Sequence, residues 1–101
     1  HSNFTLFDTM DAQNLLKELS GKITAVSDDS IKLIHQSISN WKNALVMPTE
    51  ALSVSDSEQS HLAARFYAAY ESTLHAFNAV DFDDLILLPV KLLQENPEVR
   101  E

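Results

Sequence analysis

Cysteine is absent from the 101 residues of this sequence, and glycine occurs once. The absence of cysteine excludes a disulfide scaffold and a thiolate metal site, and it is typical of a reducing compartment, so we expect a cytoplasmic protein. One glycine is too few for a glycine-rich nucleotide-binding loop or for a β-rich fold with many tight turns. No apolar run approaches the roughly 18 residues of a membrane span, and we expect no membrane association.

Positive charge is also scarce. Seven lysine and arginine residues stand against fifteen aspartate and glutamate residues, which leaves a net charge of −8. Phosphate affinity comes from lysine and arginine, so this balance argues against non-specific nucleic-acid binding by the chain on its own. Any DNA contact is therefore expected to be local and to need help from elsewhere.

Helical periodicity is the dominant pattern that the sequence contains. Apolar residues spaced three and four apart predict long helices over about 8–21, 27–48 and 57–80. A shorter helical turn is expected at 49–54, and a fourth helix is expected from residue 81. Nothing alternates with a period of two over a useful length. The predicted fold class is all-α, a compact helical subdomain of three to five helices.

The C-terminal region predicts a connection to a larger protein. Asp81 opens an acidic helix start that leads into a nearly all-apolar helix, too apolar for the free edge of a small soluble domain, and Pro89 should kink or break it. Asn96 and Pro97 would then begin a new helix close to the end of the sequence. We therefore expect a helical unit over 1–80 and a segment at 81–101 that returns toward the rest of a longer chain.

Three aspartates near this junction are candidates for chemistry. Paired carboxylates can bind Mg²⁺ or act as acid and base, and the candidates here are Asp81, Asp83 and Asp84. All three lie in the first turn of the predicted helix, where negative charge satisfies free N–H groups and the helix dipole. The structural interpretation is favoured, because nothing else assembles a catalytic constellation.

Two helical Glu/His pairs are the other metal candidates. Glu58 and His61 have the Glu-x-x-His spacing of di-iron bundles, but such a site needs two of these motifs and two further glutamates. Glu71 and His75 are four residues apart, which more often means a surface pair. We therefore assign no catalytic, cofactor-binding or metal-binding residue within the chain.

The polar cluster around Trp41 is the most site-like group. Trp41 belongs to the apolar face of the second helix, whereas Asn40, Lys42 and Asn43 surround it and could hold a phosphate or a base edge. A solvated helix face is the commoner explanation of such a pattern.

Four stretches resemble the UvrD/Rep/PcrA group of superfamily 1 DNA helicases in their order and spacing. They are Phe4–Asp8, Leu15–Leu19, Ile38–Asn43 and Val80–Pro89. The resemblance covers essentially the whole chain and indicates subdomain 1B, the helical insertion in the first RecA-like domain. Residues after about Val80 then resemble the return into the RecA-like 1A core.

The resemblance implies a parent enzyme that hydrolyses ATP with Mg²⁺, moves 3′ to 5′ on single-stranded DNA and unwinds duplex in DNA replication. It implies that 1B lines the DNA channel and helps to engage the duplex junction, with the RecA-like core of the same chain as its partner. The phosphate loop and the Mg²⁺ motif lie outside this stretch, so we expect the chain alone to be inactive, without cofactor, and monomeric unless its C-terminal apolar helix associates.

Two groups of residues are singled out, the first as a hypothesis for DNA contact and the second by the resemblance. The candidates for DNA contact are Lys32, Asn40, Lys42, Asn43 and Arg65. The family motif interpreted as structural comprises Asp81, Phe82, Asp83, Asp84 and Leu85.

A second interpretation comes from a different class of protein. A free-standing acidic helical module could bind another protein through the apolar stretch at 86–93, because a short helix that is apolar on several sides needs a cover. A Gly-x-x-x-x-Gly-Lys-Thr sequence upstream in a longer reading frame would decide for the helicase. A metal-carboxylate enzyme, the third possibility, would carry tightly bound metal after purification.

Overall fold

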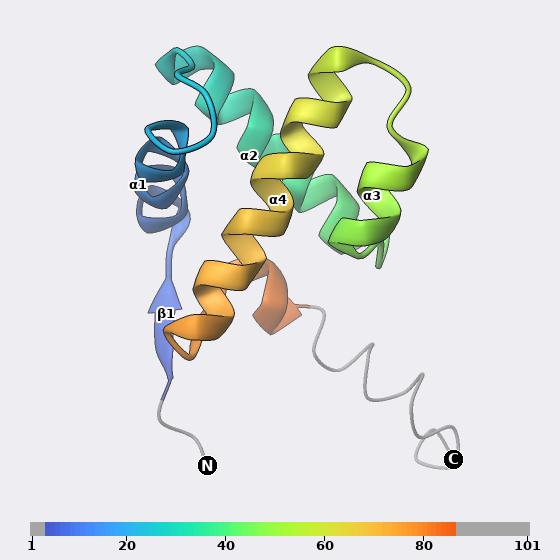
Figure 1. Cartoon of the computed structure of the whole chain (residues 1–101). Helices are drawn as coiled ribbons and strands as arrows, with labels where there is room; N and C mark the ends of the chain where they lie inside the picture. The colour runs from blue at the N-terminus through green and yellow to red at the C-terminus, as the bar shows by residue number, and fades with distance from the viewer. Residues whose placement is uncertain (1–3, 87–101) are drawn as a thin grey trace, which may run out of the picture.

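The computed structural model describes residues 4–86, which form a mostly helical unit standing on two short strands (Figure 1). The predicted helical class is confirmed. Residues 82–86 are helical after the second strand. The predicted kink at Pro89 lies outside the described residues, as does most of the apolar stretch at 86–93. In chain order the elements are β1 (Thr5–Phe7), α1 (Thr9–Ser20), α2 (Asp28–Asn43), α3 (Pro48–Val54), α4 (Glu58–Ala76) and β2 (Ala79–Asp81).

Each long helix begins at the polar residue that periodicity and capping rules indicate. The Asp8 carboxylate accepts a hydrogen bond from the Asp11 backbone N–H at 2.8 Å, and the Asp11 carboxylate accepts one from Asp8 N–H, which forms a capping box. The hydroxyls of Ser27 and Ser57 cap α2 and α4 by accepting hydrogen bonds from the backbone N–H groups of Ser30 and Ser60. Gly21 ends α1 as predicted, although its φ of −68° does not use the freedom of glycine.

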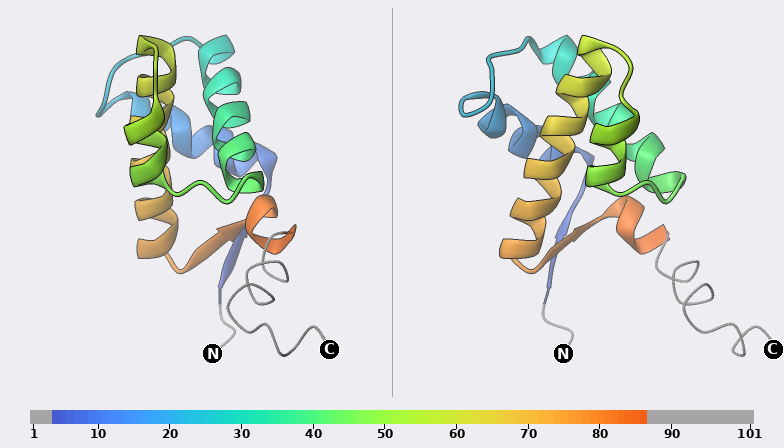
Figure 2. Two further views of the ribbon diagram at one scale, coloured as in Figure 1. Left: turned by 90° about the vertical axis from the view of Figure 1, so that its right-hand side faces the viewer. Right: turned by 45° about the vertical axis from the view of Figure 1, so that its right-hand side comes forward.

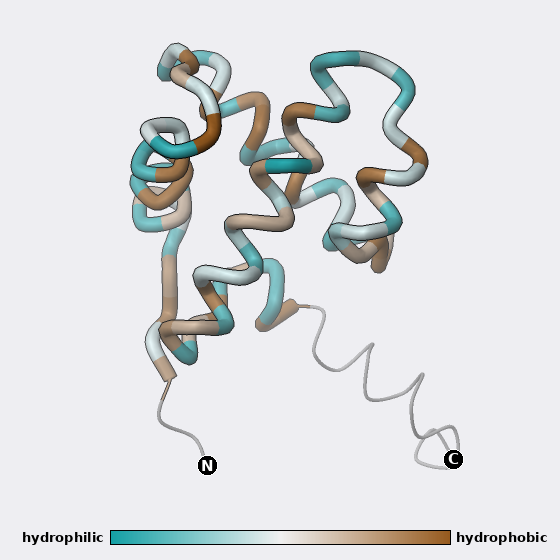
Figure 3. Tube along the Cα trace, in the orientation of Figure 1, coloured by the Kyte–Doolittle hydropathy of each residue, from teal (hydrophilic) through white to brown (hydrophobic). Residues whose placement is uncertain are grey.

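The core lies where α1, α2 and α4 face one another, and α3 covers α4 from the other side (Figure 2). Apolar and polar residues alternate along each helix (Figure 3), as expected for helices with one buried face. The largest fully buried side chains are Leu16, Ile31, Ile38, Phe66 and Tyr70.

The two strands were not predicted. β1 and β2 pair in parallel, with Leu6 opposite Val80, and all four helices lie between them in sequence. Three residues are too few to show an alternation with period two. The strand pair and the helical residues 82–86 lie together at one end of the molecule (Figures 1 and 2).

The predicted end of the third helix was also wrong. α4 stops at Ala76 rather than at Val80, because Asn78 adopts a φ of 53° and the next residues join β1. Asn tolerates this left-handed region better than most residues, so the turn is sharp and local. The helical pattern through Val80 was overridden by strand pairing with the far end of the chain.

Candidate functional site

Lys42 is buried at the C-terminal end of α2, where three carboxylates surround its ammonium group. Its exposed fraction is 5%, and its Nζ lies 2.8 Å from Glu71 Oε2 and 2.8 Å from Asp84 Oδ1. Both carboxylate oxygens of Asp81 lie 3.0 Å from the same Nζ. One side chain of α2 thus joins α4, the end of β2 and the helical residues 82–86.

Asp81 is the most heavily bonded member of this group. Tyr70 donates its hydroxyl to Asp81 Oδ2 at 2.6 Å, and the Tyr70 ring lies 5.8 Å from Lys42 Nζ. Asp81 and Asp84 also exchange two side chain–backbone hydrogen bonds of 2.9 and 3.1 Å, so Asp81 caps the helical residues 82–86 as predicted. We call Lys42, Tyr70, Glu71, Asp81 and Asp84 the Lys42 cluster.

The charges of the Lys42 cluster shift the pKa of its members in different directions. Burial alone would lower the pKa of Lys42, but the charge of Glu71 and the hydrogen bonds to Asp84 and Glu71 outweigh it and raise the pKa above its usual value. Burial raises the pKa of Glu71, and Lys42 offsets this only in part. For Asp81 burial is outweighed by the Tyr70 hydrogen bond and by Lys42, which together lower the pKa. Lys42 therefore stays charged at neutral pH.

Glu71, Asp81 and Asp84 are also the one group of potential metal ligands in residues 4–86 that the structure brings together. The point on which their oxygens converge is taken by Lys42 Nζ, which contacts all three carboxylates. The donor set is thus already neutralised in part by an ammonium group. This geometry favours a structural ion cluster over a Mg²⁺ site, in line with the interpretation of the aspartates from sequence.

The prediction of a DNA contact by Lys42 needs correction. The side chain lies inside the molecule and is held by three carboxylates, so it is not available to a phosphate in this conformation. The sequence contained a signal for this position. The buried spacing of Ile31, Ile34 and Ile38 continues to residue 42, so Lys42 lies on the buried face of α2.

The other four candidates for DNA contact are exposed but do not form one cluster. Asn40 accepts a hydrogen bond from Gln36 at 3.1 Å, and Asn43 donates one to the Ser39 carbonyl at 2.9 Å. Lys32 lies in the first half of α2, and Arg65 lies on α4.

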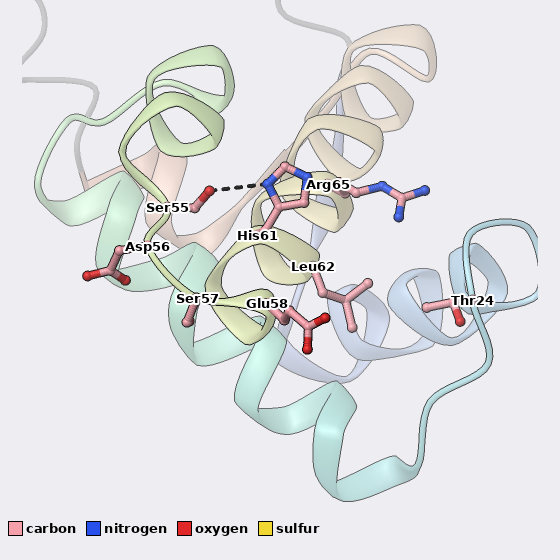
Figure 4. Close-up of a pocket in the computed structure, with 8 residues that line it drawn as sticks. All are labelled: Thr24, Ser55, Asp56, Ser57, Glu58, His61, Leu62 and Arg65. Carbon is pink, nitrogen blue, oxygen red and sulfur yellow. Dashed lines mark hydrogen bonds between the residues drawn. The ribbon is translucent and has the colours of Figure 1, made fainter.

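Arg65 borders an open pocket at the start of α4 (Figure 4). Ser55 Oγ lies 3.2 Å from His61 Nδ1 in this pocket, but the same hydroxyl donates to the Leu52 carbonyl at 2.9 Å. The Ser55 proton is therefore engaged by a backbone oxygen, which does not suit a nucleophile activated by histidine. The arginine side chain points away from the Ser55–His61 pair.

Sequence reasoning missed Tyr70 and Glu71 as members of the cluster. Glu71 was interpreted as the partner of His75 on the surface, whereas it forms an ion pair with Lys42 on the neighbouring helix. Asp83 lies next to the cluster and accepts a hydrogen bond from Ser39 of α2 at 2.8 Å. These contacts join residues far apart in sequence, and no local spacing marks them.

Comparisons with known proteins agree with the resemblance seen in the sequence. A family profile described as UvrD/REP helicase N-terminal domain matches residues 1–101. The chain is 46% identical over 102 residues to ATP-dependent DNA helicase Rep of Salmonella typhimurium and 45% identical over 102 residues to that of Escherichia coli, with 99% of this chain covered in both. ATP-dependent DNA helicase UvrD1 of Mycobacterium tuberculosis is 35% identical over 105 residues, with 100% of this chain covered.

The chain spans about 15% of the length of the Rep relatives it matches and 14% of UvrD1. Across residues 4–86 the structure contains no helix long and apolar enough to cross a membrane.

Proposed function

The chain belongs to the UvrD/REP helicase family, and we propose that it forms the 1B subdomain of an ATP-dependent 3′–5′ DNA helicase. The observation that carries this proposal is the identity of 45–46% to two Rep helicases along 99% of the chain. In the proposal the parent protein binds ATP and Mg²⁺ through residues outside this stretch. The chain itself engages DNA without catalysis.

The path of the backbone supports an inserted helical unit. The chain leaves β1, builds four helices and returns to β2, which lies beside β1 in parallel. A two-stranded sheet is at best marginally stable alone, and parallel sheets are nearly always covered on both faces. We propose that the RecA-like core of the same chain supplies this cover.

Exposed apolar side chains at the strand end of the molecule also support a cover by the RecA-like core. They lie on or beside the strands and in the helical residues 82–86, with exposed fractions as high as 66% at Ile86. We define the core-facing end by the residues Phe4, Leu6, Phe77, Phe82, Leu85 and Ile86.

DNA contact is assigned to exposed residues of α2 and α4. Lys32 and Arg65 supply positive charge, and Asn40 and Asn43 supply polar groups on the exposed side of α2. With a net charge of −8, the affinity must come from these few positions while the rest of the parent holds the strand. Lys42 is left out of this surface because it is buried.

The surface can be tested in the full-length protein with Lys32→Ala/Arg65→Ala and the control Lys17→Ala/Lys22→Ala. Each pair removes two exposed positive charges, from α2 and α4 in the first case and from the end of α1 and the turn after it in the second. We expect the first pair to weaken binding of a labelled junction DNA and to reduce the slope of log K against log salt by about 0.7–0.9 per lost contact. Fluorescence anisotropy at several salt concentrations measures both quantities. Equal behaviour of the two pairs would contradict the assignment.

The alternative function is a protein-interaction module, and the exposed apolar end favours it. ATP hydrolysis separates the two. The full-length protein should hydrolyse ATP in the presence of single-stranded DNA, and the chain of residues 1–101 should not. A full-length protein without DNA-dependent hydrolysis would rule out the helicase.

A further inference from the structure

The helical unit α1–α4 is joined to the strand pair by two short connections. Asp8 alone separates β1 from α1, and Phe77 and Asn78 separate α4 from β2. Neither connection includes α2, which reaches the strand end through side chains. The Ser39 hydroxyl contacts Asp83, and the Lys42 ammonium contacts Asp81 and Asp84.

We infer that Lys42 is a positioning residue that holds the helical unit in one orientation on the strand pair and on the segment that follows it. Its Nζ touches one carboxylate of α4 and two carboxylates beyond the helical unit, at distances of 2.8–3.0 Å. A flexible surface lysine would not hold the two parts together, since an ion pair fixes an orientation only when it is buried and has several partners at once.

The excess of negative charge means that the three carboxylates stay together only while Lys42 lies between them. One ammonium group faces three carboxylates whose ligand atoms lie within 4.8 Å of one another. Without Lys42, Glu71 of α4 would face Asp81 and Asp84 with no cation between them. Like charges in a partly buried site repel strongly, so the segment at 79–86 would be pushed away from α4.

This inference rests on the proposed function for its consequence, because a helical insertion can guide DNA only while its orientation on the motor core is fixed. Loss of that orientation should separate two activities of the parent. DNA-dependent ATP hydrolysis is carried by residues outside this stretch and should persist, whereas the base pairs unwound per ATP should fall.

Two pairs of variants of the full-length protein test the inference. Lys42→Met is compared with Lys22→Met, which removes an exposed lysine that lies outside the proposed DNA-contact surface. Asp84→Asn is compared with Asp83→Asn, which removes an equal charge from the same turn without touching Lys42. The side-chain oxygen of the new asparagine can still accept the backbone hydrogen bond of Asp81.

Hydrogen exchange read by mass spectrometry is the structural measurement. We expect Lys42→Met to speed exchange at 79–86 by about tenfold or more while the amides of α1 change little, and Asp84→Asn to do so less strongly. Adding Glu71→Gln to Lys42→Met should slow this exchange again, because it removes the carboxylate that repels the segment. Simple loss of a packed side chain would not be rescued in this way.

The functional measurement is unwinding per ATP hydrolysed. We expect a fall of about fivefold or more in Lys42→Met with DNA-dependent hydrolysis kept within about twofold of the parent. Unchanged exchange at 79–86 in a folded Lys42→Met protein overturns the inference. If that variant fails to fold, the second pair decides, and equal effects of Asp84→Asn and Asp83→Asn overturn it. A parent without ATP hydrolysis would contradict the proposed function alone, since the exchange comparison stands independently.

Discussion

Tyr67 and Tyr70 lie three residues apart on α4, and their hydroxyls meet very different partners. Tyr70 donates to the buried carboxylate of Asp81 at 2.6 Å, whereas Tyr67 donates to the Val46 carbonyl at 2.7 Å and stacks on Trp41. Burial raises the pKa of both phenols, that of Tyr67 to about 12, so both donate at neutral pH. A bond to a charged acceptor is stronger than one to a neutral carbonyl.

Replacing each tyrosine by phenylalanine should reveal that difference. We expect Tyr70→Phe to lower the free energy of unfolding by about 1.5–3 kcal/mol and Tyr67→Phe by about 1 kcal/mol, because only the former leaves a buried carboxylate short of a donor. Urea denaturation at pH 7 measures both, and each variant serves as the control for the other. A larger loss of stability in Tyr67→Phe than in Tyr70→Phe would show that Asp81 does not depend on the Tyr70 hydroxyl.

The half-buried His35 should make the stability of the fold depend on pH. Burial lowers its pKa, although the charges of Asp83 and Asp81 act in the opposite direction and Lys42 adds to the lowering. A histidine whose folded pKa is lowered favours the folded state above its unfolded value of about 6.5, and this contribution is lost as the pH falls through the folded pKa. Glu71 has the opposite sign, since its raised pKa makes acidification favour the folded state.

Comparison with His35→Gln isolates the histidine, because Glu71 titrates in both proteins. The parent should lose more stability than His35→Gln as the pH falls from about 7 to about 5. Urea denaturation across this range measures the difference, and the exposed His75 supplies the control His75→Gln. Parallel losses in the parent and His35→Gln would contradict the expected sign.

At the scale of elements, the ends of α2 and α4 decide the shape of the unit. After α2 the backbone turns at Leu45 with a φ of 60°, a region that costs a residue other than glycine about 1–2 kcal/mol. The N–H of Val46 bonds back to the Trp41 carbonyl at 2.8 Å, which directs the chain into α3. Asn78 makes the corresponding turn after α4.

The starts of these elements could be predicted, and some of their ends could not. A helix cap depends on residues three positions apart, so the sequence itself shows where it lies. The residues that cap helices here are Asp8, Ser27, Ser57 and Asp81. The end of α4 depends instead on β1, which pairs with residues 79–81 across the whole helical unit. Local patterns carry no information about such a partner.

At the scale of the whole molecule, exposed apolar side chains gather at one end. The sequence carries a net charge of −8, yet one end gathers six exposed apolar side chains, among them Phe77, Phe82 and Ile86. Exposed apolar patches of this kind mark interaction surfaces.

The chain alone should therefore bind a hydrophobic dye such as ANS, and Phe77→Ser/Phe82→Ser/Ile86→Ser should reduce that binding. These side chains are exposed, so the variant should keep its helical circular dichroism. Three exposed apolar residues elsewhere supply the control Met10→Ser/Leu33→Ser/Met47→Ser. An equal reduction by the control would show that no patch exists at the core-facing end.

The sequence by itself determined the helical class, the helix starts and the apolar faces that form the core, because each depends on spacings within one or two turns. It also marked Asp81 as a helix cap and Asp84 as an acidic residue of the first helical turn. Only the tertiary structure decided that 79–81 forms a strand and that the carboxylates of Glu71, Asp81 and Asp84 surround Lys42. A lysine can be buried only where other elements bring enough opposite charge to it, and that charge comes from α4 and from the return segment.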